Sequence, residues 1–170
     1  MKVLIMSDSH GLTDEVREIA DRHKEEVSAV IHCGDSELAL NDEHVRGMQI
    51  VRGNCDDDMA LPEELAVDVE GYRFLVVHGH LHSIKTTLMN VKYRAEEENA
   101  QIICFGHSHI AGAELEDGKL FINPGSIRLP RVRPVKTYAI LEAEGTKANV
   151  LFYDEKGNPV EELSQSFEWQ

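Results

Sequence analysis

The sequence is poor in cysteine, in basic residues and in long apolar runs. Its 170 residues include three cysteines. That odd number, with no Cys-x-x-Cys pair, excludes a disulfide framework and a structural zinc ribbon. No apolar run approaches the roughly 18–20 residues that span a bilayer. Residues 1–8 turn polar too soon to form a secretory signal. These absences predict a cytoplasmic protein with reduced thiols and no membrane partner.

Positive charge is scarce. The chain has 17 Lys and Arg residues and 31 Asp and Glu residues, which gives a formal net charge of −14. So acidic a chain repels phosphate backbones, and we expect no strong nucleic-acid binding. A small phosphate-containing substrate stays compatible with this charge if a cation is held at the site. Nine histidines point toward a metal ion in that role.

The chain carries no repeat, low-complexity tract or linker, which predicts a single domain over residues 1–170 with residues 161–170 as a polar surface tail. Helical spacing of apolar residues predicts one helix from Leu12 to Val27, capped by Thr13, and a second from Ile84 to Ala95, capped by Ser83. Apolar runs and turn signals predict strands at Val3–Met6, Ala29–His32, Gln49–Arg52, Leu65–Val69, Arg73–Val77, Gln101–Phe105, Ala113–Glu116, Lys119–Ile122, Val135–Leu141 and Lys147–Tyr153. The front of the chain is therefore β-α-β and the rear antiparallel, which favours an α/β layered sandwich.

Five of these strands end in residues that bind metals. The strand ends carry Asp8 and His10, then Gly34-Asp35, Gly53-Asn54, His78-Gly79-His80, and Gly106-His107-Ser108-His109. In open α/β sheets, sites assemble beyond the carboxyl ends of the strands, so we expect these side chains to converge. A single histidine at a strand end is more often solvated or part of the core, but five such ends in one chain favour a shared site.

Three pairs have i, i+2 spacing: Asp8 with His10, His78 with His80, and His107 with His109. In extended backbone such side chains project to one side with Cα atoms roughly 7 Å apart, which suits one ion or two adjacent ions. Imidazole, carboxylate and amide ligands favour Mn, Fe, Ni, Zn or Mg. Two carboxylates leave two divalent ions with a charge of +2, which attracts an anion and lowers the pKa of a bridging water. Hydrolysis of a phosphate ester fits this chemistry.

The motif series resembles that of the calcineurin-like metallophosphoesterases, and the segment Asn123-Pro124-Gly125-Ser126 resembles their small bacterial and archaeal phosphodiesterases of the YfcE type. The resemblance implies an α/β fold, a four-layer αββα sandwich of two mixed β-sheets flanked by helices. It also implies a phosphodiesterase in which a hydroxide bridging two divalent ions, most typically Mn²⁺ with Ni²⁺, Zn²⁺, Fe²⁺ or Mg²⁺ as alternatives, attacks a small phosphodiester. By motif, one ion would be held by Asp8, His10, Asp35 and His109, and the other by Asn54, His78, His107 and the shared Asp35.

The sequence departs from many family members at Cys55, which stands where a histidine usually follows the asparagine. The proton donor is then open between His80 and Cys55, while Asp56 is expected to act or to fix the Asn54 loop by hydrogen bonding. Asn54, His80, Asn123 and Ser126 are candidate substrate contacts. Arg128, Arg131 and Arg133 can meet a phosphate or a neighbouring subunit, and a homodimer or higher homo-oligomer stays open. Two alternative functions share this site: a phosphomonoesterase, and a non-catalytic protein-binding scaffold like the relative found in the retromer complex.

Overall fold

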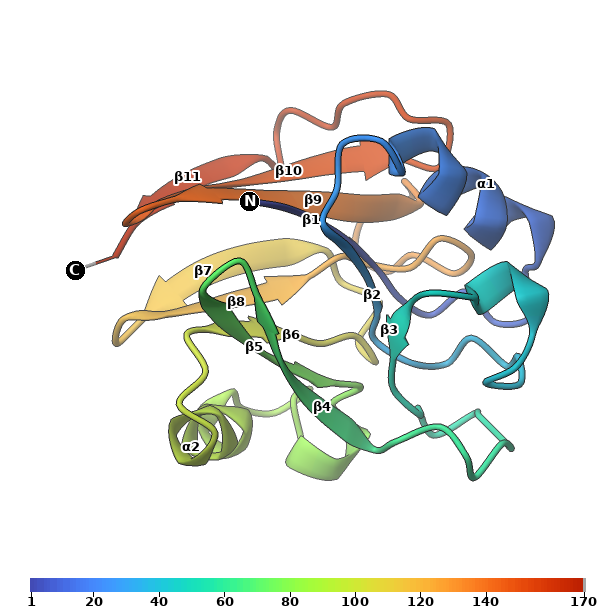
Figure 1. The fold of residues 1–170 in the computed structure, drawn as a ribbon, viewed down its shortest axis with the longest axis horizontal. Coiled ribbons are helices and arrows are strands. Elements are labelled where there is room, and N and C mark those ends of the chain that lie inside the picture. Colours follow the sequence, from blue (N-terminus) through green and yellow to red (C-terminus); the bar gives the residue numbers. More distant parts are fainter. Residues whose placement is uncertain (170) are drawn as a thin grey trace.

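The computed structural model describes residues 1–169, in which two β-sheets pack face to face (Figure 1). The first sheet has the strand order β11-β10-β9-β1-β2-β3. Its strands are β1 (Lys2–Met6), β2 (Ala29–His32), β3 (Gln49–Ile50), β9 (Thr137–Glu144), β10 (Lys147–Asp154) and β11 (Gln165–Glu168). Strand β1 pairs in parallel with β2 and antiparallel with β9, so the sheet is mixed.

The second sheet has the order β4-β5-β6-β8-β7 and is also mixed. Its strands are β4 (Glu64–Val69), β5 (Tyr72–Val77), β6 (Ile102–Cys104), β7 (Gly112–Glu116) and β8 (Lys119–Asn123). Strands β5, β6 and β8 run parallel to one another, and β7 lies antiparallel at one edge. The short 3₁₀ helices η1 (Glu43–Val45) and η2 (His80–His82) lie in the connections.

Three apolar clusters make the layers of the predicted αββα sandwich. The largest cluster fills the space between the sheets, with Ile5 and Val76 among its members. The helix α1 (Asp14–His23) covers the outer face of the first sheet through Ile19, and α2 (Met89–Glu97) covers the second sheet through Val91. The expected α/β architecture is confirmed. Within residues 1–169, no helix has the length and apolarity that a membrane crossing requires.

The two helices differ from the prediction at their ends. Helix α1 stops at His23, although Val27 still packs on the same cluster. Helix α2 begins at Met89, not at Ile84, because Ser83 has a left-handed backbone (φ 54°) that closes η2. The spacing of Ile84, Leu88, Val91 and Ala95 therefore reports burial against the second sheet, while the residues before Met89 form turns.

The polar tail expected at residues 161–170 is wrong for the part that the structure describes. Residues Gln165–Glu168 form β11 and pair antiparallel with β10. Leu163 and Trp169 are buried against the central core, and the Trp169 ring lies 6.1 Å from that of Tyr72. Phe167 also packs against this core, so three apolar residues anchor the otherwise polar segment. Gln170 lies outside the described residues.

Candidate metal centre

Five parallel strands deliver their carboxyl ends to one edge of the two sheets. From β1, β2 and the segment after β3 come Asp8, Asp35 and Asn54; from β5 and β6 come His78 and His107. The structure thus brings together ligand atoms that are about a hundred residues apart. Asp8, His10 and His109 offer atoms within 4.8 Å of one another, and so do Asp8, Asp35 and His78.

Asp8 lies at the centre of this cluster and is fully buried. Its Oδ2 atom accepts hydrogen bonds from the Ser7 hydroxyl (2.6 Å) and from the backbone N–H of His107 (3.1 Å). Its Oδ1 atom lies 3.1 Å from His109 Nε2 and 3.8 Å from His78 Nε2. Burial raises the pKa of Asp8, but the histidines and Ser7 outweigh it and lower the pKa below its ordinary value. An ionised carboxylate is therefore presented to both histidines.

Asp35 is held from the opposite side. Its Oδ1 accepts the backbone N–H of Cys55 (2.8 Å), which leaves Oδ2 facing His78 Nε2 at 3.2 Å and His10 Nε2 at 4.0 Å. Burial opposes ionisation, yet the bonds with His78 and Cys55 hold the pKa of Asp35 well below its usual range. Since both carboxylates are anionic at neutral pH, the cluster favours a cation.

The remaining candidate ligands face the same space. Asn54 Oδ1 lies 3.0 Å from His78 Nε2, and the Nδ1 atom of His78 bonds the Cys33 carbonyl at 2.8 Å. That second bond fixes which ring nitrogen points inward. The His107 ring centroid lies 5.0 Å from that of His78. His109 is fixed in the same way, with Nδ1 on the Leu129 carbonyl at 2.7 Å.

The backbone at the site is not extended as the i, i+2 argument assumed. Asp8, His10, Asp35, His107 and His109 all have positive φ, between 43° and 68°. Left-handed conformations of non-glycine residues cost energy and concentrate at functional sites. The alternation of left-handed and ordinary residues turns each loop sharply, and this turn brings both members of a pair to the centre.

Two glycines are required by close approach. A Cβ atom on Gly53 would overlap the Asp35 carboxylate, and one on Gly106 would overlap Ser7 and the Asp8 carboxylate. Any larger residue would therefore displace the two carboxylates. Gly53 and Gly106 are part of the site for this reason.

His80 and Cys55, the candidate proton donors, lie at different sides of the cluster. The His80 ring lies 5.4 Å from His78 and 6.1 Å from His107, and its buried Nδ1 has no hydrogen-bond partner within residues 1–169. Burial and the charge of His78 lower the pKa of His80. Cys55 is exposed next to His10 and Asp35. Partial burial and the Asp35 carboxylate raise the pKa of the Cys55 thiol to about 11, so it stays protonated.

Three candidates take structural positions. Both oxygens of Asp56 accept backbone N–H groups, so this carboxylate ties the neighbouring loops together. Ser126 is completely buried and donates to the Asp8 carbonyl at 2.7 Å, so it does not reach a substrate. Asn123 is nearly buried and donates to Gly106 O and Ser108 Oγ. The expectation that Ser126 contacts substrate is corrected by its burial.

Some supporting contacts were not predicted from the sequence. Glu37 lies 3.1 Å from His10 Nδ1, and Arg128 donates to the His10 carbonyl. The fully buried His32 bonds Ser9 at 2.8 Å, and burial lowers its pKa to about 4, so it is a neutral brace and not a ligand. Only the adjacency of Glu37 to the Gly34-Asp35 turn could have flagged it.

The residues fit divalent cations by their own geometry. Asp8 Oδ1 is buried and accepts no hydrogen bond from residues 1–169. The Nε2 atoms of His10 and His109 point at each other across 3.2 Å. An unsatisfied buried carboxylate oxygen facing several imidazole nitrogens is costly unless a cation completes the set. Imidazole, carboxylate and amide donors suit Mn, Fe, Ni, Zn or Mg, as the sequence predicted.

Comparison with known proteins identifies relatives of the chain in sequence and in structure. Residues 1–146 match the family described as the calcineurin-like phosphoesterase superfamily domain. The probable metallophosphoesterase YsnB of Bacillus subtilis is 56% identical over 163 residues, which are 96% of this chain and 96% of that protein. The crystal structure of a predicted phosphoesterase from Streptococcus pneumoniae has a TM-score of 0.95 at 36% identity and covers 98% of this chain and 97% of its own.

More distant proteins extend the comparison. Phosphodiesterase MJ0936 of Methanocaldococcus jannaschii is 26% identical over 163 residues, covering 85% of this chain and 94% of that protein. Vps29 of Entamoeba histolytica complexed with zinc has a TM-score of 0.76 at 20% identity, with both chains covered completely. At that identity the likeness to Vps29 shows a common fold.

Proposed function

Because the chain belongs to the calcineurin-like phosphoesterase superfamily, we propose that it hydrolyses small phosphodiesters at a pair of divalent cations. Family membership makes the chain a metallophosphoesterase, and divalent metals fit its ligand clusters. The diester substrate, the number of ions and the choice of Mn²⁺ are the proposed part. The observation that carries the proposal is the convergence of Asp8, Asp35 and His78 with the histidines that face them.

Seven residues would hold the ions. Asp8, His10, Asp35 and His109 form one group, and Asn54, His78 and His107 form the other with Asp35 shared. When bound, two divalent ions supply a water activated near neutral pH and compensate negative charge on the phosphoryl oxygens. The two carboxylates contribute −2, so a positive charge remains to attract an anionic diester in a chain that is otherwise strongly acidic.

The chain's own residues complete the reaction. Water attacks phosphorus, the bond to one ester oxygen breaks, and the departing alcohol takes up a proton. His80 stands beside His78 and His107 and is the candidate donor to that oxygen. Cys55, protonated and exposed near His10, is the alternative donor. Asp56 holds the Asp35 and Gly53 backbone in place during the step.

Activity on two matched substrates tests the proposal. Protein stripped with EDTA and reloaded with Mn²⁺, Ni²⁺, Zn²⁺, Fe²⁺ or Mg²⁺ is assayed on bis-(p-nitrophenyl) phosphate and on p-nitrophenyl phosphate, with bound metal measured in parallel. We expect metal-dependent cleavage of the diester in preference to the monoester, with Mn²⁺ most effective. Preference for the monoester would indicate a phosphomonoesterase. Bound metal without turnover of either substrate would indicate the non-catalytic scaffold.

The Asp35→Asn variant separates the dinuclear site from a single-ion site. Asp35 faces histidines of both groups, so its neutralisation should abolish activity and reduce bound metal from two ions to one or none. Asp57→Asn is the matched control, because Asp57 is exposed in the neighbouring loop and carries the same charge. Wild-type turnover by Asp35→Asn would contradict the shared-ligand assignment.

A further inference from the structure

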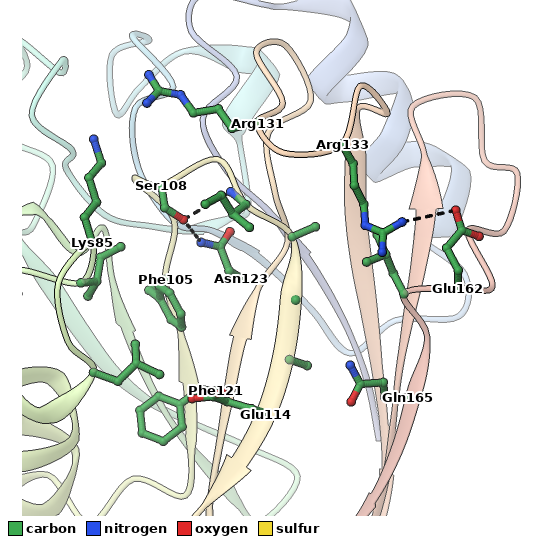
Figure 2. Close-up of a pocket in the computed structure, with 17 residues that line it drawn as sticks. Lys85, Phe105, Ser108, Glu114, Phe121, Asn123, Arg131, Arg133, Glu162 and Gln165 are labelled. Atoms are coloured by element: carbon green, nitrogen blue, oxygen red, sulfur yellow. Dashed lines mark hydrogen bonds and ion pairs between the residues drawn. The ribbon is translucent and has the colours of Figure 1, made fainter.

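A groove of about 710 Å³ opens beside the metal centre, and none of the proposed ligands lines it (Figure 2). Ile84, Leu88, Phe105 and Phe121 supply apolar surface to its wall. Ser108, Asn123 and Glu114 add polar groups at separate points. A volume of this size, lined by apolar and polar groups in similar measure, falls within the range of small-molecule sites, which run to roughly 300–1,000 Å³.

The groove is joined to the metal centre by one short loop. Ser108 lines the groove and lies between His107 and His109 in the sequence. Its hydroxyl accepts a hydrogen bond from Asn123 (3.0 Å), so the loop is held rigidly at the boundary. The backbone N–H of Arg131 bonds the His109 carbonyl at 3.0 Å, which anchors a second lining residue to the same loop. A substrate bound at the ions therefore has this groove beside it.

Two cations stand near this boundary. In Figure 2 the side chains of Lys85 and Arg131 lie at the same end of the groove as Ser108. Both side chains are exposed, and no carboxylate in residues 1–169 lies within 4.0 Å of either charged group, the distance of an ion pair. Arg133, by contrast, lies 3.8 Å from Glu162.

We propose that this groove binds the alcohol portion of the phosphodiester, with an aromatic or apolar body against Phe105 and Leu88 and a second anionic group on Lys85 and Arg131. The inference rests on the proposed function and narrows its substrate to diesters with a large, additionally charged alcohol. Lys and Arg hold phosphate or carboxylate through charge-assisted hydrogen bonds.

A second copy of the chain fits this groove less well. The strand β7 borders the groove and is an edge of its sheet, so its outer backbone groups are open to strand addition. Glu114 and Glu116 are exposed on that strand, and like charges on an edge oppose pairing with another copy. The cations at the metal-proximal end favour an anionic small molecule instead.

Three diesters that release the same p-nitrophenolate test the proposal. They are methyl p-nitrophenyl phosphate, thymidine 5′-(p-nitrophenyl phosphate), and the same nucleotide with a 3′-phosphate. The first lacks the body, the second has it, and the third adds the second anionic group. We expect KM to fall along the series in the Mn²⁺-loaded protein, with kcat nearly constant because the leaving group does not change.

Charge variants assign the second anionic group. Lys85→Ala and Arg131→Ala should each raise KM for the 3′-phosphorylated diester about tenfold and leave kcat within about twofold, as expected for one charge-assisted contact. KM for the methyl diester should stay unchanged. Lys156→Ala is the matched control, since Lys156 is an exposed cation lining a different cavity. Equal rises for all three diesters would mean only a general field effect and would overturn the proposal.

Bulk variants assign the groove itself. Gly112 lines it, and a Cβ there would meet no atom within 4 Å. Gly112→Leu should raise KM for both nucleotide diesters and not for the methyl diester, while Gly112→Ala should behave like the wild type. Thermal unfolding midpoints of both variants confirm that they fold. A Gly112→Leu protein with wild-type KM values would overturn the proposal.

A binding measurement separates this inference from the proposed function. Calorimetric titration of the metal-free protein with thymidine 3′,5′-bisphosphate needs no turnover. Binding that is weakened by Arg131→Ala and not by Lys156→Ala would support the groove even if no diester is hydrolysed. Hydrolysis of the methyl diester with no KM difference along the series, and no bisphosphate binding, would leave the phosphodiesterase standing and refute the groove.

Discussion

The Asp56 carboxylate accepts the backbone N–H of Asp35 at 2.8 Å, although the two residues come from different strand ends. The same oxygen accepts the Gly53 N–H at 2.6 Å, and the second oxygen accepts the Glu37 N–H at 2.7 Å. One side chain thus ties the Asp35 turn to the Asn54 loop. These loops carry ligands of both proposed ions, so Asp56 sets the distance between the two loops.

Asp56→Asn should therefore weaken metal binding without removing a ligand. The amide presents an N–H₂ group to at least one backbone donor, and the two loops separate. We expect metal affinity to fall roughly 10–100-fold, as is common for residues that support metal ligands, with kcat largely recovered at saturating Mn²⁺. Activity titrated against metal concentration measures this. Asp57→Asn is the control, and a loss of kcat that saturating metal does not restore would make Asp56 a reacting group.

Much of this site was predictable from the order of strand ends. Each ligand follows a strand of the parallel part of a sheet, and parallel strands share one edge, so Asp8 and His107 meet although 99 residues separate them. The backbone conformation at the ligands could not be predicted from the sequence. The left-handed φ of Asp8 and His109 depends on contacts with other loops, and propensity does not encode those contacts.

The errors in the fold have the same origin. Ile84 and Leu88 pack on the second sheet as the helical spacing suggested, but the left-handed Ser83 delays the helix to Met89. The segment 161–169 looked like a polar tail because its three apolar anchors, Leu163, Phe167 and Trp169, pack only against residues distant in the sequence. In both cases packing against residues distant in the sequence set the local structure.

Gly106→Ala should disrupt the centre through one methyl group. The added Cβ overlaps Ser7 and the Asp8 carboxylate. Overpacking of this kind costs about 1–3 kcal/mol and here displaces the carboxylate of Asp8, a ligand of the first proposed ion. We expect a lower thermal midpoint together with loss of bound metal and of activity. Gly112→Ala is the matched control, because its Cβ meets open space; equal effects of the two substitutions would contradict the steric argument.

The leaving-group dependence should reveal the proton donor. His80→Ala should slow a diester with an alkyl leaving group at least tenfold more than bis-(p-nitrophenyl) phosphate, because p-nitrophenolate needs little protonation. Cys55→Ala should slow both substrates only a few-fold, since the thiol with its pKa raised to about 11 is a poor acid near neutral pH. Rates over a series of leaving groups measure this. A selective loss of several orders of magnitude in Cys55→Ala would instead identify the thiol as the acid.

Trp169→Ala should lower stability and leave catalysis intact. The indole is only 7% exposed and packs on Tyr72. Trp169 directly follows β11, and its backbone N–H donates to the Thr146 carbonyl at 2.9 Å. Burial of so large a ring predicts a loss of roughly 3 kcal/mol for Trp→Ala.

Urea unfolding of Trp169→Ala, compared with the exposed neighbour variant Glu168→Ala, measures that loss. The edge formed by β10 and β11 contributes none of the proposed ligands, so kcat and KM of the folded Trp169→Ala protein should match the wild type. A stability change within about 0.5 kcal/mol, the range of ordinary surface substitutions, would mean that residues 161–169 behave as the free tail that their polarity suggests. The full loss would instead show that β11 belongs to the cooperative unit of the first sheet.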